Sequence, residues 1–256
     1  MNIFVLMKRT FDTEEKILIN NGKIEESGAE FIINPYDEYA IEEAIILREQ
    51  HGGEVTVVTV GEEETEKELR TALAMGVDKA VLIKSDELDV IDQFTVSMIL
   101  AAYLKNQEYD MIIGGNVTVD GGSGQVGPSV AEILDIPQVT TITNLEINDM
   151  KATIVRDVEG NEEIVEVSLP VLVTAQQGLN EPRYPSLPGI MKAKKKPLVK
   201  LELDDLNLDV DDIEAKSETV EVFLPSAKQA GKVLEGENQT QVKELISLLI
   251  SEAKVI

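Results

Sequence analysis

The chain has 256 residues, 43% of them hydrophobic, which is enough for one large α/β domain or such a domain with an appendage. Its net charge of −25 at pH 7 argues against nucleic acid as a partner, because affinity for phosphates needs a strongly basic face. Cysteine is absent and His51 is the only histidine, which excludes thiolate catalysis, disulfides, iron–sulfur clusters and cysteine zinc sites, and leaves a bound organic cofactor for any redox chemistry.

Up to about residue 138, apolar runs that predict strands alternate with helical patterns, and the connections are short. This rhythm predicts parallel βαβ units in a doubly wound, mostly parallel, Rossmann-like α/β sheet. Strands are expected at 2–7, ending near Ile33, and at 54–61, 79–84 and 109–115, and helices from Pro35 to about His51, at 62–76 and at 90–107. Ligands bind such sheets beyond the carboxyl ends of the strands, so four loops are expected to meet at one rim, those after Met7, Ile33, Val60 and Ile113.

The helix after Ile33 has clear start signals in the sequence. Asn34 can cap it, Pro35 suits its first position, and the acidic Asp37 favours the positive end of the helix dipole. His51 falls at the polar end of this helix and is expected to be a solvated surface histidine.

A glycine-rich loop follows the strand at 109–115, and Pro128 fixes where the next helix starts. Proline lacks an N–H and fits without loss only in the first helical turn, so the helix is expected to start between Gly124 and Gly127. A helix N-terminus behind such a turn offers free N–H groups to a phosphate. The loop is neither a Walker A motif nor the dinucleotide fingerprint, and a tight turn without ligand explains it equally well.

The pattern changes after about residue 139. Alternating apolar and polar residues predict antiparallel strands that end in a buried strand at 170–175. Residues from 205 are acidic and poorly periodic, and the chain closes on an amphipathic helix. We therefore expect an α/β domain at 1–204 with an antiparallel extension, followed by a C-terminal arm at 205–256.

The sequence carries no sign of a membrane span or of a secretory signal. No apolar run approaches 18 residues, and the first basic residues follow the N-terminal apolar run instead of preceding it. These features predict an intracellular, cytoplasmic protein that does not insert into a membrane. The acidic surface is expected to keep the protein soluble, or alternatively to steer basic partners.

Five segments together resemble the β subunit of electron transfer flavoprotein. They are "VLMKRTFD" (5–12), "NPYDEYAIEEAIILRE" (34–49), "RTALAMGVDKA" (70–80), "VDGGSGQVGPSVAEILDIPQ" (119–138) and "LNEPRYPSLPGIMKAKKKP" (179–197). They span most of the first 200 residues in the family's order, and the last segment is the most specific. Beyond residue 205 the chain resembles the family only in its general character, without a matching motif.

The resemblance implies an electron-carrier subunit without catalytic residues of its own, which pairs with a larger α subunit. The heterodimer carries one FAD, held mostly by the α subunit, and the C-terminal arm would pack on that subunit. It accepts electrons from acyl-CoA and related dehydrogenases, as in fatty acid oxidation, and passes them to a membrane quinone oxidoreductase. The β subunit itself buries an AMP that has no redox role.

The resemblance places the AMP pocket at the rim expected from the sheet. Backbone N–H groups from Gly124 to Gly127 would hold the phosphate, and Leu6 and Val60 would flank the adenine. The expected nucleotide-binding residues are Leu6, Asn34, Pro35, Tyr36, Asp37, Val60, Asp120, Gly121, Gly122, Ser123, Gly124, Gln125, Val126, Gly127 and Val130.

Three alternatives to the AMP-binding subunit remain. In electron-bifurcating relatives the same pocket holds a second FAD; they share "VDG" and "QVGP", although they usually have Asp-Thr in place of Gly122-Ser123. A stand-alone adenine-nucleotide sensor would explain the glycine loop but not residues 179–197. An ATP-dependent ligase of related topology would need a Ser-Gly-Gly-x-Asp-Ser type of loop early in the chain, and the sequence has none.

Residues 179–197 resemble the loop by which the family recognises dehydrogenases. Arg183 and four lysines make this segment basic within an acidic chain, and a solvated basic turn is the simpler explanation without the resemblance. In the family, a leucine that matches Leu187 fills an apolar pocket on the dehydrogenase, and the prolines on either side would reduce the entropy lost on docking. The expected docking residues are Leu187, Lys192, Lys194, Lys195 and Lys196.

Overall fold

A computed structural model of the chain describes residues 1–228 and 230–256. The described residues divide into a large compact unit, Met1–Leu18 with Ile24–Val220, and a small unit, Ile19–Lys23 with Glu221–Ile256. All the residues expected to bind nucleotide or to dock a partner lie in the compact unit.

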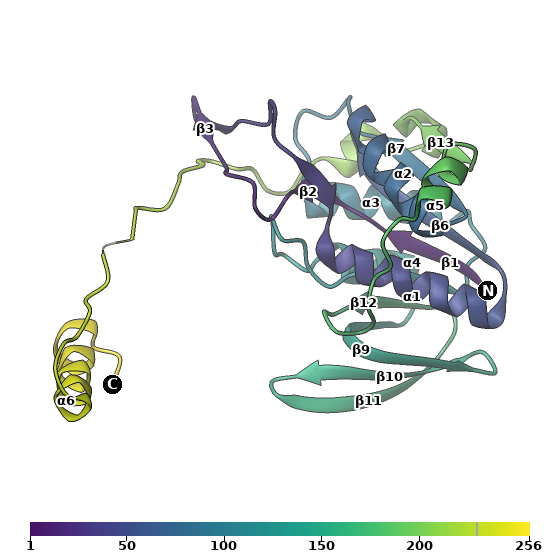
Figure 1. Ribbon diagram of the computed structural model, residues 1–256. Helices are drawn as coiled ribbons and strands as arrows, with labels where there is room; N and C mark the ends of the chain where they lie inside the picture. The colour runs from purple at the N-terminus through teal and green to yellow at the C-terminus, as the bar shows by residue number, and fades with distance from the viewer. Residues whose placement is uncertain (229) are drawn as a thin grey trace. The chain divides into compact units, whose positions relative to one another are not determined.

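The compact unit is built on one nine-stranded sheet with the order β11-β10-β9-β12-β8-β1-β6-β7-β13 (Figure 1). The neighbours from β9 to β13 in this order run parallel, whereas β10 is antiparallel to both β9 and β11. This confirms the predicted doubly wound sheet with an antiparallel extension. The strands are β1 Asn2–Leu6, β6 Glu54–Gly61, β7 Lys79–Lys84, β8 Met111–Gly115, β9 Gln138–Asn148, β10 Lys151–Val158, β11 Asn161–Ser168, β12 Val171–Ala175 and β13 Leu198–Leu201.

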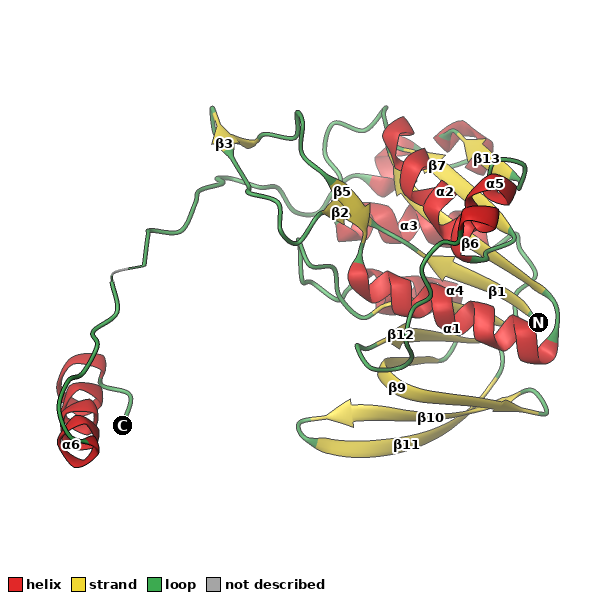
Figure 2. Ribbon diagram, in the orientation of Figure 1, coloured by secondary structure: helices red, strands yellow, loops and turns green. Residues whose placement is uncertain are grey.

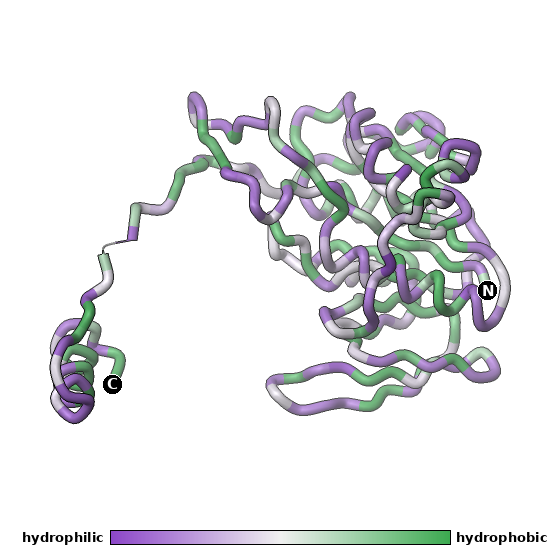
Figure 3. The backbone as a smooth tube through the Cα atoms, in the orientation of Figure 1, coloured by the Kyte–Doolittle hydropathy of each residue, from purple (hydrophilic) through white to green (hydrophobic). Residues whose placement is uncertain are grey.

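Helices cover both faces of the sheet (Figure 2). Strand β1 shows why: Ile3 and Val5 pack in one apolar cluster with α1 and α2, and Phe4 and Leu6 pack in another with α3 and α4. Alternate residues of a strand point to opposite faces, so a strand covered on both sides must be apolar throughout. The hydrophobic stretches accordingly run through the central strands (Figure 3). The helices of this unit are α1 Pro35–His51, α2 Glu66–Met75, α3 Gln93–Leu104, α4 Val126–Leu134 and α5 Leu187–Ala193.

The strand expected to end near Ile33 does not join the main sheet. It is β5, Phe31–Ile33, and it pairs antiparallel with β2, Arg9–Phe11, in a separate two-stranded sheet. The chain therefore makes a short excursion between β1 and α1, which includes the small hairpin of β3 Ile19–Asn20 and β4 Lys23–Ile24. The first crossover of the main sheet runs from β1 through α1 to β6, and α1 still begins at Pro35 as predicted.

Two other regions differ from the sequence expectation. Strand β12 lies between β8 and β9 and is parallel to both, whereas the pattern predicted that it closes an antiparallel set. Its five residues are all buried, so alternation cannot reveal its direction. Residues 205–220 were expected in the arm, but the compact unit continues to Val220. Short 3₁₀ turns at Leu203–Leu206 and Val210–Ile213 insert apolar side chains beside α3, and Ile213 is 1% exposed.

The small unit contains the helix predicted at the C-terminus. It is α6, Asn238–Leu248, continued by a wider turn at Leu249–Ala253. Within residues 230–256, α6 has no buried residue, and Val242, Leu245 and Ile246 are all exposed. In the described part of the chain, none of the helices combines the length and the hydrophobicity that crossing a membrane requires.

Candidate functional site

A cavity of about 520 Å³ lies at the carboxyl ends of the central strands. Leu6, Val60 and Gly114 line it from the ends of β1, β6 and β8. The first turns of α3 and α4 complete its wall, with Gln93 from α3 and Val126 from α4. This is the rim at which open parallel sheets bind ligands, as expected from the strand order. We call this cavity the cleft.

The N-terminus of α4 opens into the cleft. The helix begins at Val126, inside the interval that Pro128 predicted, and no side chain in the described part of the chain caps it through a hydrogen bond. The first N–H groups of a helix have no partner within the helix, so Val126 and Gly127 can offer them to a ligand. Both residues line the cleft. The positive end of the helix dipole adds to the attraction for an anion.

Glycine is required around this turn for two different reasons. Gly122 and Gly124 have φ of 63° and 62°, the left-handed region that glycine adopts most easily. Gly127 has no such angle; an added Cβ would lie 2.9 Å from Thr174 Cγ2 on β12. Gly127 therefore lets α4 pack closely on the sheet, which brings the helix N-terminus to the strand ends.

Asp37, in the first turn of α1, is a buried residue of the cleft lining. The Asp37 carboxylate accepts hydrogen bonds from the Lys8 N–H at 2.7 Å and the Gly115 N–H at 2.9 Å. It thereby joins the ends of β1 and β8 to α1. Burial raises the pKa of Asp37 to about 7, against the opposing effect of these hydrogen bonds. A carboxyl group at the base of the cleft thus titrates near neutral pH.

Asn34 was expected to cap α1 through its side chain, but the structure uses it differently. Its Nδ2 donates to Val117 O at 2.9 Å, and its Oδ1 accepts from the Val119 N–H at 3.1 Å. Two complementary hydrogen bonds outside the helix satisfy the amide better than one cap, and they leave the cap without a side-chain bond. Asn34 therefore fixes the start of the glycine-rich loop.

The structure divides the residues expected to bind nucleotide into two groups. One group lines the cleft, and it consists of Leu6, Asp37, Val60, Asp120, Gly121, Ser123, Val126 and Gly127. The other group lies outside the lining, and it consists of Asn34, Pro35, Tyr36, Gly122, Gly124, Gln125 and Val130. Val130 lies on the buried face of α4, and its side chain packs in the core instead of facing the cleft.

The sequence did not predict several residues that line the cleft. Lys8 lines the cleft and forms an ion pair there, with Nζ 2.6 Å from Asp120 Oδ2. Arg9 stacks over the Phe31 ring, with Cζ 3.6 Å from the centroid. Thr10 is 1% exposed, and its hydroxyl has no hydrogen-bond partner within the described residues. The signal for all three was their position directly after β1, at the predicted rim.

Asp92 fixes the wall of the cleft at the start of α3. One carboxylate oxygen accepts from the Thr95 N–H at 2.9 Å, and the other accepts from the backbone N–H groups of Lys216 and Ser217. Burial raises the pKa of Asp92, but these hydrogen bonds outweigh it and bring the value to about 2. The carboxylate therefore holds residues 216–217 against α3 at any physiological pH.

The second region of interest is residues 179–197, which we call the basic segment. Its middle forms the short helix α5 where a loop was expected, and Ser186 Oγ caps it by accepting from the Gly189 N–H at 3.1 Å. Leu187 begins this helix and is 80% exposed. Tyr184 and Met191 are also exposed, at 94% and 73%. Three lysines of the same segment are exposed too: Lys192, Lys194 and Lys195.

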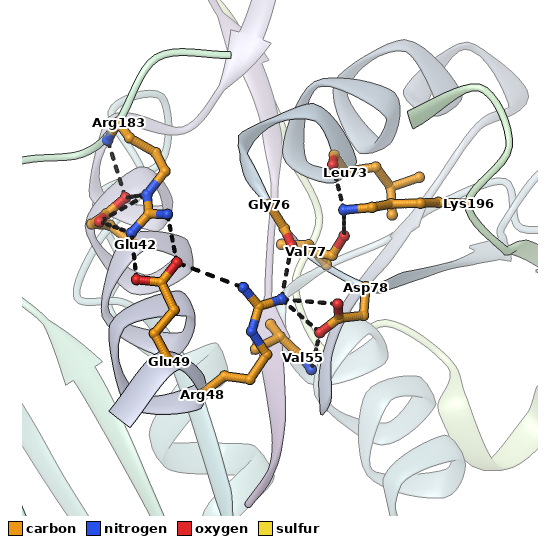
Figure 4. Close-up of polar contacts among 10 residues, drawn as sticks. All are labelled: Glu42, Arg48, Glu49, Val55, Leu73, Gly76, Val77, Asp78, Arg183 and Lys196. Carbon is orange, nitrogen blue, oxygen red and sulfur yellow. Dashed lines mark hydrogen bonds and ion pairs between the residues drawn. The ribbon is translucent and has the colours of Figure 1, made fainter. Parts of the chain in front are cut away.

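Lys196 and Arg183 differ from the exposed cations of the basic segment (Figure 4). Lys196 Nζ donates to Leu73 O at 3.0 Å and Val77 O at 2.5 Å, at the end of α2. Burial lowers the pKa of this ammonium group. Arg183 forms ion pairs with Glu42 and Glu49 of α1. Both charges are therefore engaged within the chain and are not displayed with the other lysines.

Comparison with known proteins gives consistent results over the whole chain. The family described as electron transfer flavoprotein domain matches residues 21–206. The chain is 68% identical to electron transfer flavoprotein subunit beta of Bacillus subtilis (strain 168), over 100% of both chains. It is 41% identical to the protein of the same name from Syntrophomonas wolfei, over 100% of this chain and 98% of the relative. It is 35% identical to caffeyl-CoA reductase-Etf complex subunit CarD of Acetobacterium woodii, over 99% and 98% respectively.

Proposed function

This chain belongs to the electron transfer flavoprotein family, as a β subunit, and from this premise we propose that its cleft binds AMP and that its basic segment docks dehydrogenases. A β subunit of this family acts in electron transfer together with an α subunit. We further propose that the α subunit holds most of the FAD, which supplies the redox chemistry when bound. The dehydrogenases that donate electrons are of the acyl-CoA class, and the acceptor is a membrane quinone oxidoreductase.

The observation that carries the AMP proposal is the uncapped N-terminus of α4 at the cleft. The amides of Val126 and Gly127 suit a phosphate, and the Lys8 ammonium is available if it exchanges Asp120 for the ligand. Apolar side chains of the lining suit a purine ring, with Leu6 and Val60 at the strand ends. A cavity of about 520 Å³ is within the usual range for small ligands.

A second FAD in the cleft is the other candidate. The cleft extends past the residues expected to hold AMP and reaches Arg9, Phe11 and Phe31 of the small sheet. Thr10, whose buried hydroxyl lacks a partner among the described residues, lines the same extension. This additional space and its aromatic surface favour a ligand larger than a mononucleotide.

The docking proposal depends on the exposed apolar side chains of the basic segment. An isolated exposed leucine has no meaning, because much of any protein surface is apolar. Tyr184 and Met191 of the same segment are exposed as well, and so are three of its lysines. Exposed apolar side chains together with charged ones are the composition of an interaction surface. We propose Leu187 as the anchor and the lysines as the groups that steer an acidic dehydrogenase surface.

The arm offers a third surface. Helix α6 presents Val242, Leu245 and Ile246 to solvent, and within residues 230–256 it has no buried residue. An amphipathic helix of this kind needs a partner to cover its apolar face. We propose that the α subunit is that partner.

The test is to identify every nucleotide that the protein releases. The chain would be produced together with its α subunit, denatured, and the nucleotides separated and counted. We expect one AMP and one FAD per heterodimer. Two FAD without AMP would replace the AMP proposal by the second candidate. One FAD and no other nucleotide would show that the cleft is not a nucleotide site. A Leu187→Ala heterodimer is the matched control and should release the same nucleotides as the wild type.

A further inference from the structure

The first end of the basic segment is bonded to α1 through Arg183. Its Nε lies 2.9 Å from Glu42 Oε2 and its Nη2 lies 2.9 Å from Glu42 Oε1, a bidentate pair. Its Nη1 reaches Glu49 Oε1 at 2.8 Å. Glu42 is 4% exposed, so this ion pair is shielded from water on one side. Planar pairing of this kind fixes orientation as well as distance.

A second contact secures the same end. Asn180 Nδ2 donates to Tyr39 O at 3.0 Å and to Glu43 Oε2 at 2.9 Å. Glu43 is 6% exposed. The stretch from Asn180 to Arg183 is therefore held along α1 by two buried carboxylates.

The other end of the basic segment is hydrogen-bonded to α2 and the turn after it. A lysine of the segment donates to that region, and an arginine of α2 donates to the segment. Lys196 Nζ donates to Leu73 O in the last turn of α2 and to Val77 O just after the helix ends. Arg70 of α2 reaches back, and its Nη1 donates to Ala193 O at 3.0 Å and Lys196 O at 3.2 Å. A cation at the C-terminal end of a helix is favoured by the helix dipole, so Lys196 and α2 stabilise each other.

The polar contacts of the two ends reach the same stretch of chain, residues 73–78 (Figure 4). Glu49, which binds Arg183, lies 3.8 Å from Arg48 Nη2. Arg48 Nη1 donates to Gly76 O at 2.9 Å and lies 2.8 Å from Asp78 Oδ2. Gly76 and Asp78 belong to the turn after α2, where Lys196 also binds. The first end is therefore linked to Gly76 and Asp78 through Glu49 and Arg48, and the other end binds Leu73 and Val77 directly.

The middle of the basic segment contrasts with its ends. Leu187 and Met191 project into solvent, while Gly189 lies so close to α2 that an added Cβ would be 2.5 Å from Ala74 O. The backbone is therefore seated on α2 and only the outer side chains are free. A segment with fixed ends and an exposed tip can present an anchor residue in one defined geometry.

We propose that Arg183 and Lys196 are positioning residues, which hold Leu187 in the geometry that a dehydrogenase recognises. The inference rests on the docking role proposed above. A segment that is ordered before binding loses less entropy when the partner docks, so its restraints raise affinity without touching the partner. Arg183 and Lys196 would act on affinity in this way, and the electron transfer step itself would not change.

The experiment compares heterodimers that carry Arg183→Gln, Arg183→Lys, Lys196→Met or Leu187→Ala. Flavin reduction is followed while a reduced acyl-CoA dehydrogenase is titrated. Loss of one restraint is expected to raise the half-saturating dehydrogenase concentration about three- to tenfold, with the rate at saturation unchanged. Arg183→Lys keeps the charge but not the bidentate geometry, so it should lose affinity too. Lys200→Gln is the matched control, because Lys200 also pairs with two glutamates, Glu63 and Glu66, but lies outside the segment.

Two further measurements separate positioning from a merely structural role. Arg183→Gln combined with Leu187→Ala should bind almost as Leu187→Ala alone does, because Arg183 acts through Leu187. Hydrogen exchange at residues 179–197 should rise in the Arg183 and Lys196 variants and stay at the wild-type level in Lys200→Gln. Glu49→Gln, which loosens Arg183 from an exposed position, replaces Arg183→Gln if that variant does not fold.

Three results would overturn the inference. If Leu187→Ala weakens binding while the Arg183 and Lys196 variants bind as the wild type, docking stands and the restraints have no part in it. Additive effects of Arg183→Gln and Leu187→Ala would likewise show that Arg183 does not act through Leu187. If Leu187→Ala itself binds normally, the proposed docking role fails, and the positioning role fails with it.

Discussion

The cleft and the basic segment lie on the same compact unit, but different interactions hold them. The cleft is made of strand ends and a helix N-terminus, and buried side chains such as Asp37 fix it by bonding to main-chain N–H groups. The basic segment is held by long charged side chains at its two ends, and its anchor residue is free. We infer that close packing and a buried carboxyl group maintain the structure of the cleft, whereas the geometry of ion pairs maintains the structure of the basic segment.

The largest effect is expected where packing sets the cleft. Gly127→Val would force a branched side chain against Thr174, since even a Cβ would lie 2.9 Å from Thr174 Cγ2. Overpacking of this kind costs about 1–3 kcal/mol. If α4 moves, the bound nucleotide is lost too, and with it about 2.7 kcal/mol of stabilisation at a hundredfold ligand excess over the dissociation constant. Thermal unfolding and nucleotide content of the heterodimer measure both effects.

The control for Gly127→Val is Glu162→Val, because Glu162 is exposed on strand β11 and does not line the cleft. Its nucleotide content should equal that of the wild type. Normal nucleotide content and melting temperature in Gly127→Val would show that α4 does not need its close approach to β12.

A smaller effect is expected from the buried charge of the cleft. The pKa of Asp37 is raised by burial from 3.8 to about 7. The folded protein therefore binds this proton more tightly than the unfolded chain does, so stability falls as pH rises between about 4 and 7 and changes little above that window. Between pH 5.5 and pH 8 the contribution amounts to roughly 2 kcal/mol. Urea unfolding across this range should show a shallower pH dependence for Asp37→Asn than for the wild type.

Asp149→Asn serves as the control for Asp37→Asn, since Asp149 is exposed at the turn between β9 and β10. Its pH dependence should follow that of the wild type. The same pH dependence in Asp37→Asn and the wild type would mean that Asp37 stays ionised in the fold and that the cleft does not depend on its burial.

Local patterns in the sequence predicted the main features of the cleft. The start of α4 followed from Pro128, and the rim followed from the order of strands and helices. These signals can be recognised in the sequence, because the start of a helix and the end of a strand are determined by residues within a few positions. They could not reveal that Asn34 bonds to Val117, since 83 residues separate the two and the amide suits a cap equally well.

The basic segment was recognisable only as a motif, and its attachment was not predictable. Arg183 and Glu42 are 141 residues apart, and Lys196 is 123 residues from Leu73. In a chain with 48 acidic residues, the sequence does not say which carboxylate an arginine will meet. Pairing of this kind depends on the packing of α1, α2 and the segment together. For the same reason the lysine run did not reveal that Lys196 turns inward while Lys194 and Lys195 remain exposed.

The most direct test of this division of roles is the affinity of the Leu187→Ala heterodimer for a reduced acyl-CoA dehydrogenase. Burying a leucine side chain contributes roughly 1.5–3 kcal/mol, so the truncation should weaken binding about tenfold or more. The flavin spectrum, the nucleotide content and the melting temperature should match those of the wild type, because Leu187 is 80% exposed and does not line the cleft. Equal affinity of wild type and variant would contradict the docking role and leave residues 179–197 as an ordinary basic surface segment.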